Sequence, residues 1–258
     1  MAAGDVVCSL TKIKSYQCGL YNGVDNSSVV LKQLITKYPM TLAGWCNLNS
    51  DNANNGVIIG MAEDGVDGDR CALYINTAEL PNLHHRKGAD TSGSIAATTN
   101  LTENKWHHIA GVWETVNSRK IYVDGVLEAT DTNVVAFSTC TNITIGYYKT
   151  NVPTSWMDGH IRECVMYNKA LSQTEITELA SGTRPKTAKD RLVGHWRLNT
   201  DSTDEIDGND MTDANVSFIN KEESVAIQVD SQRVAATDTW LIAGGKHGQV
   251  LITNIEEA

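Results

Sequence analysis

Short apolar stretches alternate with polar, turn-forming clusters along most of the chain. The stretches are rich in β-branched and aromatic residues, as in TLAGWCNL (41–48), CALYINTA (71–78) and TNITIGYY (141–148). Clusters of Asn, Asp, Gly and Ser separate them at intervals of about ten residues, a spacing typical of antiparallel sandwiches and barrels. The pattern therefore predicts an all-β fold.

One hairpin turn is predicted at Asp124-Gly125, between the strand-like runs KIYV and VLEA. Asp-Gly in this setting is the strongest short hairpin signal, because both central residues of the turn need a positive φ. We expect Trp106 and Tyr122 to lie on neighbouring strands that are joined near this turn.

One short surface helix is predicted after residue 172. Ser172 and Glu175 form a capping box, in which each side chain bonds the backbone N–H of the other residue. Ile176 and Leu179 then share one face of the helix, and Gly182 supplies a left-handed stop.

A polar, mostly basic connector at 183–191 (TRPKTAKDR) divides the chain. We expect residues 1–182 to form a jelly roll. The segment 192–258 is too short for a substantial core of its own. Its first strand, LVGHWRLN, is therefore expected to complete the sandwich, and residues 225–256 to present an edge for pairing with another chain. An incomplete second module is the alternative interpretation of this segment.

Composition limits the partners of the protein. The chain has 258 residues, with 31 acidic and 21 basic side chains and a formal net charge of −10. The hydrophobic fraction of 41% excludes disorder as the state of the chain, and the acidic excess disfavours nucleic acid as a partner because no basic field can collect phosphates. No apolar run approaches the roughly 18 residues of a membrane-spanning helix. The N-terminus shows no basic segment followed by an apolar one, so we expect no classical signal peptide.

Cysteine and histidine spacing gives no metal or catalytic signature. The six cysteines contain no CxxC pair, so a zinc site is disfavoured and buried reduced thiols are expected. The pairs His84-His85 and His107-His108 would point to opposite faces of a strand, so neither pair can converge on one ligand. We interpret them as core or surface histidines.

Three segments resemble the laminin G-like or concanavalin A-like jelly-roll family. They are GLYNGVDNSSVVL (19–31), NKWHHIAGVW with RKIYVDGVLEA (104–129), and the run from ITIGYY to ELASG (143–182). Together they cover residues 19–182. The family's usual positions are taken by Trp106, His107, His108, Ile109, Ala110, Tyr122, Val123, Asp124 and Gly125 in the second segment, and by Gly159, Ile161, Glu163, Tyr167, Leu171 and Glu175 in the third.

The resemblance implies a two-sheet antiparallel jelly-roll sandwich, here with one short surface helix and a C-terminal β extension. It says little about function, because one sandwich hosts many activities. Arg162 stands where the family commonly has an aspartate. This departure weakens any metal or polar role carried over to that position.

An acidic segment, E-I-D-G-N-D from Glu205 to Asp210, has three interpretations. Laminarinase-type β-glucanases on this fold use the strand motif E-x-D-x-x-E, whose carboxylates serve as nucleophile and acid/base. Here the last glutamate is replaced by Asp210 and the aromatic wall of a glucan cleft is missing. A solvated acidic loop is favoured, and a calcium loop that uses Asp204, Asp207 and Asp210 is the alternative.

Aromatic residues gather in a turn-rich segment, YYKTNVPTSW, that contains Tyr147, Tyr148 and Trp156. Aromatic side chains on sandwich loops can stack on sugar rings or fill interfaces, so these three residues are the candidate ligand-binding residues. Packing beneath the loop is their alternative role.

The sequence contains no catalytic constellation, so we expect a protein that is not an enzyme. Our main hypothesis is a structural or adhesive module, such as a virion-surface or capsid decoration protein of a phage. A glycan-binding lectin is the alternative, and a glucan-active glycosidase is the third hypothesis.

These hypotheses set the expected partners and location. The partners would be protein subunits of an assembly or a homo-oligomer, with a glycan as a further candidate and without nucleic acid or a membrane span. The location would be a virion or extracellular surface, and otherwise the cytoplasm. No cofactor is required, and Ca²⁺ is the one candidate.

Overall fold

The computed structural model describes residues 6–49, 55–65, 68–88, 91–136, 139–149, 154–227 and 250–257. The chain divides into two compact units, one of residues 17–219 and one of the terminal segments 1–16 and 220–258. In the terminal unit, β1 (Val6–Asn22) pairs antiparallel with β16 (Val250–Glu257).

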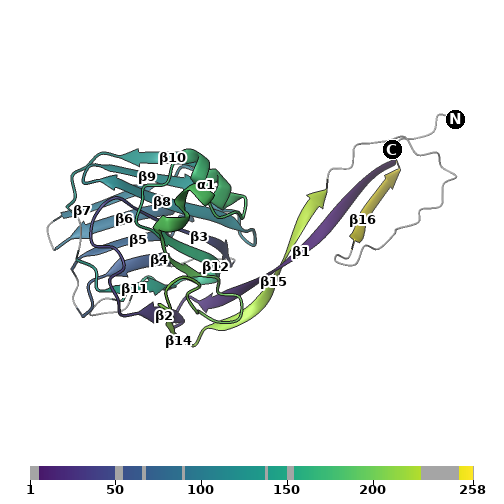
Figure 1. The fold of residues 1–258 in the computed structure, drawn as a ribbon. Coiled ribbons are helices and arrows are strands. Elements are labelled where there is room, and N and C mark those ends of the chain that lie inside the picture. Colours follow the sequence, from purple (N-terminus) through teal and green to yellow (C-terminus); the bar gives the residue numbers. More distant parts are fainter. Residues whose placement is uncertain are drawn as a thin grey trace. The chain divides into compact units, whose positions relative to one another are not determined.

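The larger unit is a sandwich of antiparallel sheets (Figure 1). Among the described residues, sheet A contains nine strands in the order β10-β9-β8-β3-β12-β1-β15, with β13 also paired to β12; the ninth, β16, pairs with β1 in the terminal unit. Its remaining strands are β3 (Met40–Leu48), β8 (His107–Thr115), β9 (Ser118–Val123), β10 (Val126–Asp131), β12 (Asp158–Tyr167), β13 (Leu192–Trp196) and β15 (Ser217–Ile227).

Sheet B contains seven described strands in the order β14-β2-β11-β4-β5-β6-β7. The predicted all-β, two-sheet antiparallel sandwich is therefore confirmed. The strands of sheet B are β2 (Ser27–Val30), β4 (Gly56–Ala62), β5 (Arg70–Ile75), β6 (Pro81–Lys87), β7 (Thr91–Ala96), β11 (Asn142–Ile145) and β14 (Thr212–Ala214).

The core lies between the sheets, where inward-facing residues of both sheets are fully buried. Leu42 and Trp113 of sheet A and Ile59 and Leu73 of sheet B are all 0% exposed and belong to one cluster. Burial of each such side chain contributes roughly 1.5–3 kcal/mol relative to exposure. Five cysteines are buried free thiols, as predicted, and the side chain of Cys8 lies outside those described; the five are Cys18, Cys46, Cys71, Cys140 and Cys164.

The turn predicted at Asp124-Gly125 is confirmed and joins β9 to β10, with φ of 49° and 83° at the two residues. The further expectation that the strands of Trp106 and Tyr122 are joined near this turn is wrong, although β8 and β9 are neighbours in sheet A. Trp106 lies just before β8, and β8 is joined to β9 by the two residues 116–117. That turn is Val-Asn, which carries no glycine signal.

The predicted helix is confirmed as α1 (Gln173–Ala180), capped by the reciprocal Ser172–Glu175 bonds. Its buried residues pack on the outer face of sheet A, the face turned away from sheet B. Beyond it, the 3₁₀ helix η1 (Lys186–Arg191) leads to β13, which pairs antiparallel with β12. The domain boundaries predicted at 182 and 192 stay a prediction.

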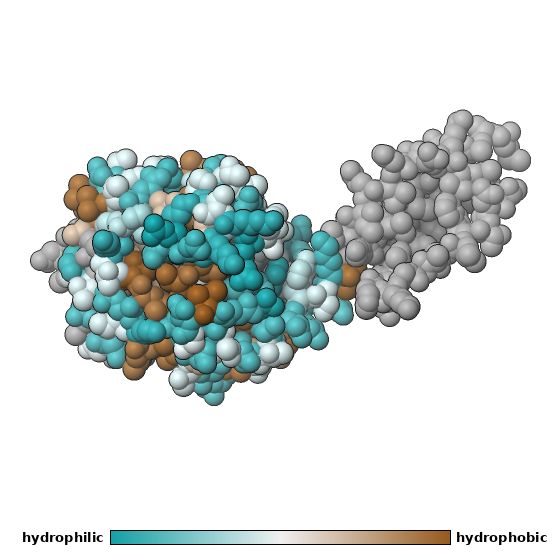
Figure 2. Space-filling view, in the orientation of Figure 1, coloured by the Kyte–Doolittle hydropathy of each residue, from teal (hydrophilic) through white to brown (hydrophobic). Residues whose placement is uncertain are grey.

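Neither described helix has the length and apolar character that crossing a bilayer requires. The face shown in Figure 2 is mostly hydrophilic and carries a hydrophobic patch near the middle of the sandwich.

Candidate functional site

Two of the three predicted ligand-binding aromatics line two neighbouring cavities, of about 190 and 300 Å³. Tyr148 lines the first and Trp156 the second. Tyr147 lines neither, but it stacks on Trp156 with ring centroids 4.8 Å apart and planes 13° from parallel. We call the two cavities the aromatic cleft; its lining residues are Gly23, Asn55, Arg70, Tyr74, His84, Tyr148, Thr154, Ser155 and Trp156.

Strand periodicity places the polar wall of this cleft. Along β5, Cys71 and Leu73 are fully buried in the core, whereas Arg70 and Tyr74 are partly exposed on the opposite, outer face of sheet B. His84 of β6 pairs in register with the small Ala72 and lies on the same outer face. The two-residue period of a strand thus brings three side chains of the cleft onto one surface.

The aromatic rings of the cleft contact one another through their edges. His84 lies between Tyr74 and Tyr148, with ring centroids 6.2 and 6.3 Å away and the rings at 73° and 66°. The guanidinium carbon of Arg70 lies 5.4 Å from the centre of the Tyr148 ring. This arrangement is compatible with edge-to-face and cation–π attraction and holds the rings in place.

Two buried polar atoms of the cleft have no hydrogen-bond partner in the described structure, the hydroxyl of Tyr148 and Nε2 of His84. Burial, together with the charges of Arg70 and Arg86, lowers the pKa of His84 to about 4. Burial also raises the pKa of Tyr148. Both groups are therefore neutral near pH 7. An unmet buried polar group costs about 1–3 kcal/mol, which a ligand hydroxyl could recover.

Sequence reasoning missed Arg70, Tyr74 and His84. Adjacent histidines do diverge as expected, because His85 is 0% exposed and contacts the Tyr38 hydroxyl in the core, while His84 faces outward. The one signal in the sequence was the spacing of Arg70 and Tyr74, which alternate with apolar residues on the same strand. This spacing could not show that the strand of His84 lies beside it.

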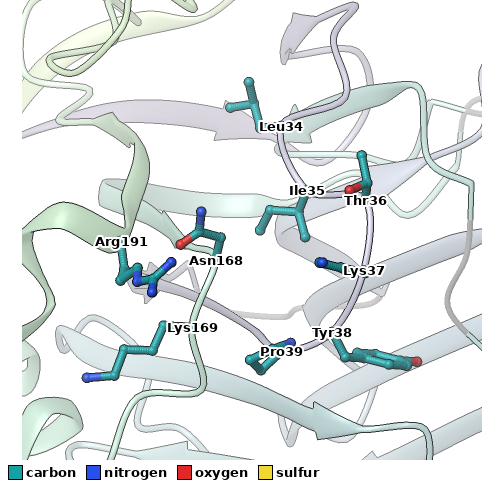
Figure 3. Close-up of a pocket in the computed structure, with 9 residues that line it drawn as sticks. All are labelled: Leu34, Ile35, Thr36, Lys37, Tyr38, Pro39, Asn168, Lys169 and Arg191. Carbon is teal, nitrogen blue, oxygen red and sulfur yellow. The ribbon is translucent and has the colours of Figure 1, made fainter.

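A larger cavity of about 400 Å³ lies between the loop 34–39 and residues 168, 169 and 191 (Figure 3). Lys169 already pairs with Glu175 at 2.5 Å. The Tyr38 ring is directed away from the other lining side chains, and its hydroxyl donates to the carbonyl oxygen of Val135 at 2.9 Å. This cavity lacks an available aromatic face, so the aromatic cleft is the better candidate.

Asp204 organises the predicted acidic loop. It is 5% exposed, and its carboxylate accepts the backbone N–H groups of His195, Ile206, Asp207 and Asn209 at 2.8–3.2 Å. Burial raises the pKa of Asp204, but these bonds outweigh it and hold the pKa below its usual value.

These contacts bear on the calcium hypothesis. Asp207 and Asp210 are exposed, and Asp210 accepts the backbone N–H of Asp204 at 2.9 Å. Among the described residues, no group of three or more His, Cys, Asp or Glu side chains is arranged to hold a metal ion. The calcium site at Asp204, Asp207 and Asp210 stays a prediction, in which Asp204 would have to exchange N–H donors for the cation.

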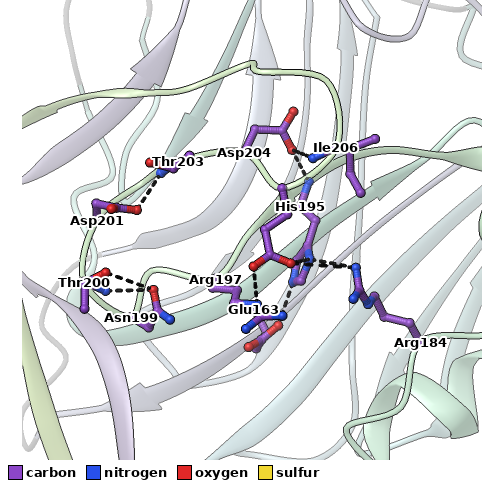
Figure 4. Close-up of polar contacts among 11 residues, drawn as sticks. Glu163, Arg184, His195, Arg197, Asn199, Thr200, Asp201, Thr203, Asp204 and Ile206 are labelled. Carbon is purple, nitrogen blue, oxygen red and sulfur yellow. Dashed lines mark hydrogen bonds and ion pairs between the residues drawn. The ribbon is translucent and has the colours of Figure 1, made fainter.

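The side chain of Glu205 contacts His195 and Arg197, and His195 lies close to Glu163 and Arg184 (Figure 4). Glu205 lies 3.3 Å from Nδ1 of His195 and accepts from Nε of Arg197 at 2.6 Å. On the other side of the imidazole, Glu163 lies 2.6 Å from Nε2. Residues 205–207 form a turn, so the strand arrangement of the glucanase motif is not formed here.

Comparison with known families places the fold. A family model described as the concanavalin A-like lectin/glucanases superfamily matches residues 22–177. The chain belongs to this superfamily. The resemblance predicted from the sequence is therefore confirmed for this concanavalin A-like domain. The comparison with curated proteins found no match.

Solved structures support the same fold. A protein from Bacteroides ovatus described as carbohydrate-binding superposes with a TM-score of 0.59 and 16% identity, over 84% of this chain and 62% of its own. This chain thus spans less than two thirds of that protein. The CBM40 module of a Ruminococcus gnavus IT-sialidase, solved with α2,3-sialyllactose, superposes with a TM-score of 0.54 and 16% sequence identity, over 63% of this chain and 96% of the module.

A third structure is domain 4 of AbnA, a GH43 extracellular arabinanase from Geobacillus stearothermophilus, solved with arabinotriose. It gives a TM-score of 0.51 and 19% identity, over 63% of this chain and 76% of its own. At such identities the likeness shows the fold alone. None of these three structures is a virion protein by name, so our main hypothesis of a virion component receives no support from them.

Proposed function

We propose that this concanavalin A-like domain binds glycans and that the aromatic cleft holds the sugar. The observation that carries the proposal is the pair of buried polar atoms without partners, the Tyr148 hydroxyl and His84 Nε2, at a cleft lined by aromatic rings. The carbohydrate-binding names of the similar structures support it over the virion hypothesis.

The lining chemistry suits a saccharide. Trp156 is half-buried and backed by the parallel ring of Tyr147, so its indole can pack against the C–H face of a sugar. Sugar hydroxyls both donate and accept, and they can bond Tyr148, His84 and Asn55 around that platform. An apolar surface with a few oriented polar groups is the usual composition of a small-ligand site.

The cleft supports binding without catalysis. Glycoside hydrolysis usually needs a pair of carboxylates on either side of the scissile bond. Among the described residues, the lining of the aromatic cleft includes no Asp or Glu, and its charged member is Arg70. We therefore propose a non-catalytic module that needs no metal for binding, acting where glycans are displayed, at an extracellular surface.

A glycan array probed with the full chain tests this function, with Tyr148→Phe and Trp156→Ala as variants. We expect the wild type to bind at least one glycan. Loss of the Tyr148 hydroxyl should weaken that binding about fivefold to thirtyfold, which corresponds to about 1–2 kcal/mol of binding free energy.

Tyr122→Phe is the matched control, because it removes a hydroxyl from a buried tyrosine of sheet A that does not line the cleft. It should bind like the wild type. No binding across the array would contradict the proposal, and so would equal binding by the wild type and both cleft variants.

A further inference from the structure

A separate cavity of about 340 Å³ lies on the outer face of sheet A, beside the end of α1. We call it the arginine cleft. The lining residues that matter are Trp45, His108, Arg162, Glu163, Arg184 and Arg197. All belong to the larger unit, and none lines the aromatic cleft.

Arg162 is fixed between two indole rings. Its guanidinium carbon lies 4.7 Å from the ring centre of Trp45 and 4.7 Å from that of Trp106. Trp45 pairs in register with both Arg162 on β12 and His108 on β8, so the three side chains form one row across the sheet. Arg162, which stands where the family commonly has an aspartate, therefore places a positive charge in a fixed orientation at the cleft.

His108 contributes a buried polar atom to the cleft. The residue is 2% exposed, and Nδ1 of its imidazole has no hydrogen-bond partner in the described structure. The ring contacts Trp45 edge to face at 5.4 Å. Burial lowers the pKa of His108 to about 4, so the imidazole is neutral and can bond a hydroxyl group.

Glu163 is held in a strained conformation. It has a φ of 51°, at a bulge where the pairing of β12 with β3 shifts between Arg162 and Val165. Such a position commonly takes glycine, and a side chain there costs of order 1–3 kcal/mol. One carboxylate oxygen of Glu163 pairs with His195 at 2.6 Å, while the side chain stays 39% exposed at the cleft.

The charge of the lining is positive although the chain is acidic. Three guanidinium groups face one carboxylate, that of Glu163. Arg197 is engaged by Glu205 at 2.6 Å, but Arg184 comes no closer than 3.9 Å to the same carboxylate. One terminal nitrogen of Arg184 lies 3.3 Å from Nδ1 of His195, but the side chain is 47% exposed, so an incoming anionic group can pair with its other N–H groups.

We infer that the arginine cleft is a second saccharide site and that its ligand carries a carboxylate. The sugar packs beside Trp45, its hydroxyls bond Glu163 and His108, and its carboxylate pairs with Arg184. The inference goes beyond the proposed function, because it assigns a site on the other sheet and a specific class of sugar.

Titration of the full chain with matched sugars tests the inference. The probes are methyl β-glucuronide with methyl β-glucoside and methyl α-galacturonide with methyl α-galactoside, which differ within each pair only in the carboxylate. Binding is followed by NMR shifts of the Trp45 indole N–H. We expect at least one acidic sugar to bind about fivefold or more tightly than its neutral partner. Arg184→Gln should remove this preference, and Glu163→Gln should weaken the binding of both sugars of the pair.

Two controls separate this site from the aromatic cleft. Arg191→Gln removes an exposed arginine outside both clefts and should leave the affinities unchanged. Tyr148→Phe should also leave them unchanged, even if it abolishes glycan binding at the aromatic cleft. The inference is overturned if none of the four sugars shifts the Trp45 signal, or if the acidic preference persists in Arg184→Gln.

Discussion

Tyr148 combines burial with an unmet hydroxyl group, and this combination predicts opposite effects on stability and binding. The residue is 6% exposed, and its hydroxyl has no partner in the described structure. Tyr148→Phe removes a polar group whose burial is uncompensated, so we expect the free energy of unfolding to rise by about 1 kcal/mol. Urea denaturation measures this change. A less stable variant would show that the hydroxyl is satisfied in the free protein.

The candidate site was predictable only in part, because the sequence shows which residue types are present but not which of them are in contact. Tyr147, Tyr148 and Trp156 stand out as aromatic residues in a turn-rich segment. The sequence could not show that Tyr147 supports Trp156 from behind. His84 and Arg70 join the site through the pairing of β5 with β6, which depends on the assembled sheet.

At the scale of elements, the turn between β9 and β10 is also a packing contact with α1. Gly125 has a φ of 83°, and a Cβ placed there would lie 3.2 Å from the Cβ of Ala180. Gly125→Val should therefore lower the free energy of unfolding by about 1–3 kcal/mol through backbone strain, with crowding in addition.

Gly182 provides the matched comparison for this turn. Its φ is 82°, but a Cβ there would meet nothing within 4 Å. Gly182→Val should therefore lower the free energy of unfolding through backbone strain alone, and by less than Gly125→Val does. Thermal melting of both variants checks the order, and an unchanged melting temperature for Gly125→Val would refute the proposed contact.

The cap of α1 predicts a pH dependence of stability. Burial raises the pKa of Glu175, but bonds from Lys169, Ser172 and Thr187 outweigh it and lower the pKa to about 2. A depressed pKa in the folded state stabilises above the unfolded value, and this stability is lost as the pH falls toward the folded value. Wild-type stability should therefore fall more steeply than that of Glu175→Gln between about pH 4.5 and 2. Parallel slopes in acid denaturation would contradict the assignment.

Elements with local signals were predictable, and those set by long-range pairing were not. The capping box of α1 and the Asp124-Gly125 turn are written in a few adjacent residues. The Val-Asn turn at 116–117 and the bulge at Glu163 carry no such signal. Both depend on the register of β8 or β12 with its neighbour.

At the scale of the whole molecule, the two proposed clefts lie on the outer faces of different sheets. Sheet A carries Trp45 and Arg162 of the arginine cleft, whereas sheet B carries Tyr74 and His84 of the aromatic cleft. A ligand bound at one sheet leaves the other accessible, because the core separates them. The domain would thus bind two sugar chains at once, and such bivalency raises avidity for surfaces that display both.

The segment that follows α1 supports the arginine cleft. Trp196 of β13 is 0% exposed, and its Nε1 donates to the carbonyl oxygen of Asn209 at 2.9 Å. β13 also pairs with β12, the strand that carries Arg162 and Glu163. This segment therefore contributes to the sandwich and supports the arginine cleft.

Two truncations test which residues the sandwich needs. A chain of residues 1–182 loses Trp196, Leu198 and Met211 from the main core cluster, so it should not unfold cooperatively. A chain of residues 17–219 retains every buried member of both larger clusters and should unfold cooperatively near the wild-type temperature. Circular dichroism during heating measures both. A cooperative transition of the 1–182 chain at the wild-type temperature would show that the later strands are dispensable, and loss of folding in the 17–219 chain would show that the terminal unit is required.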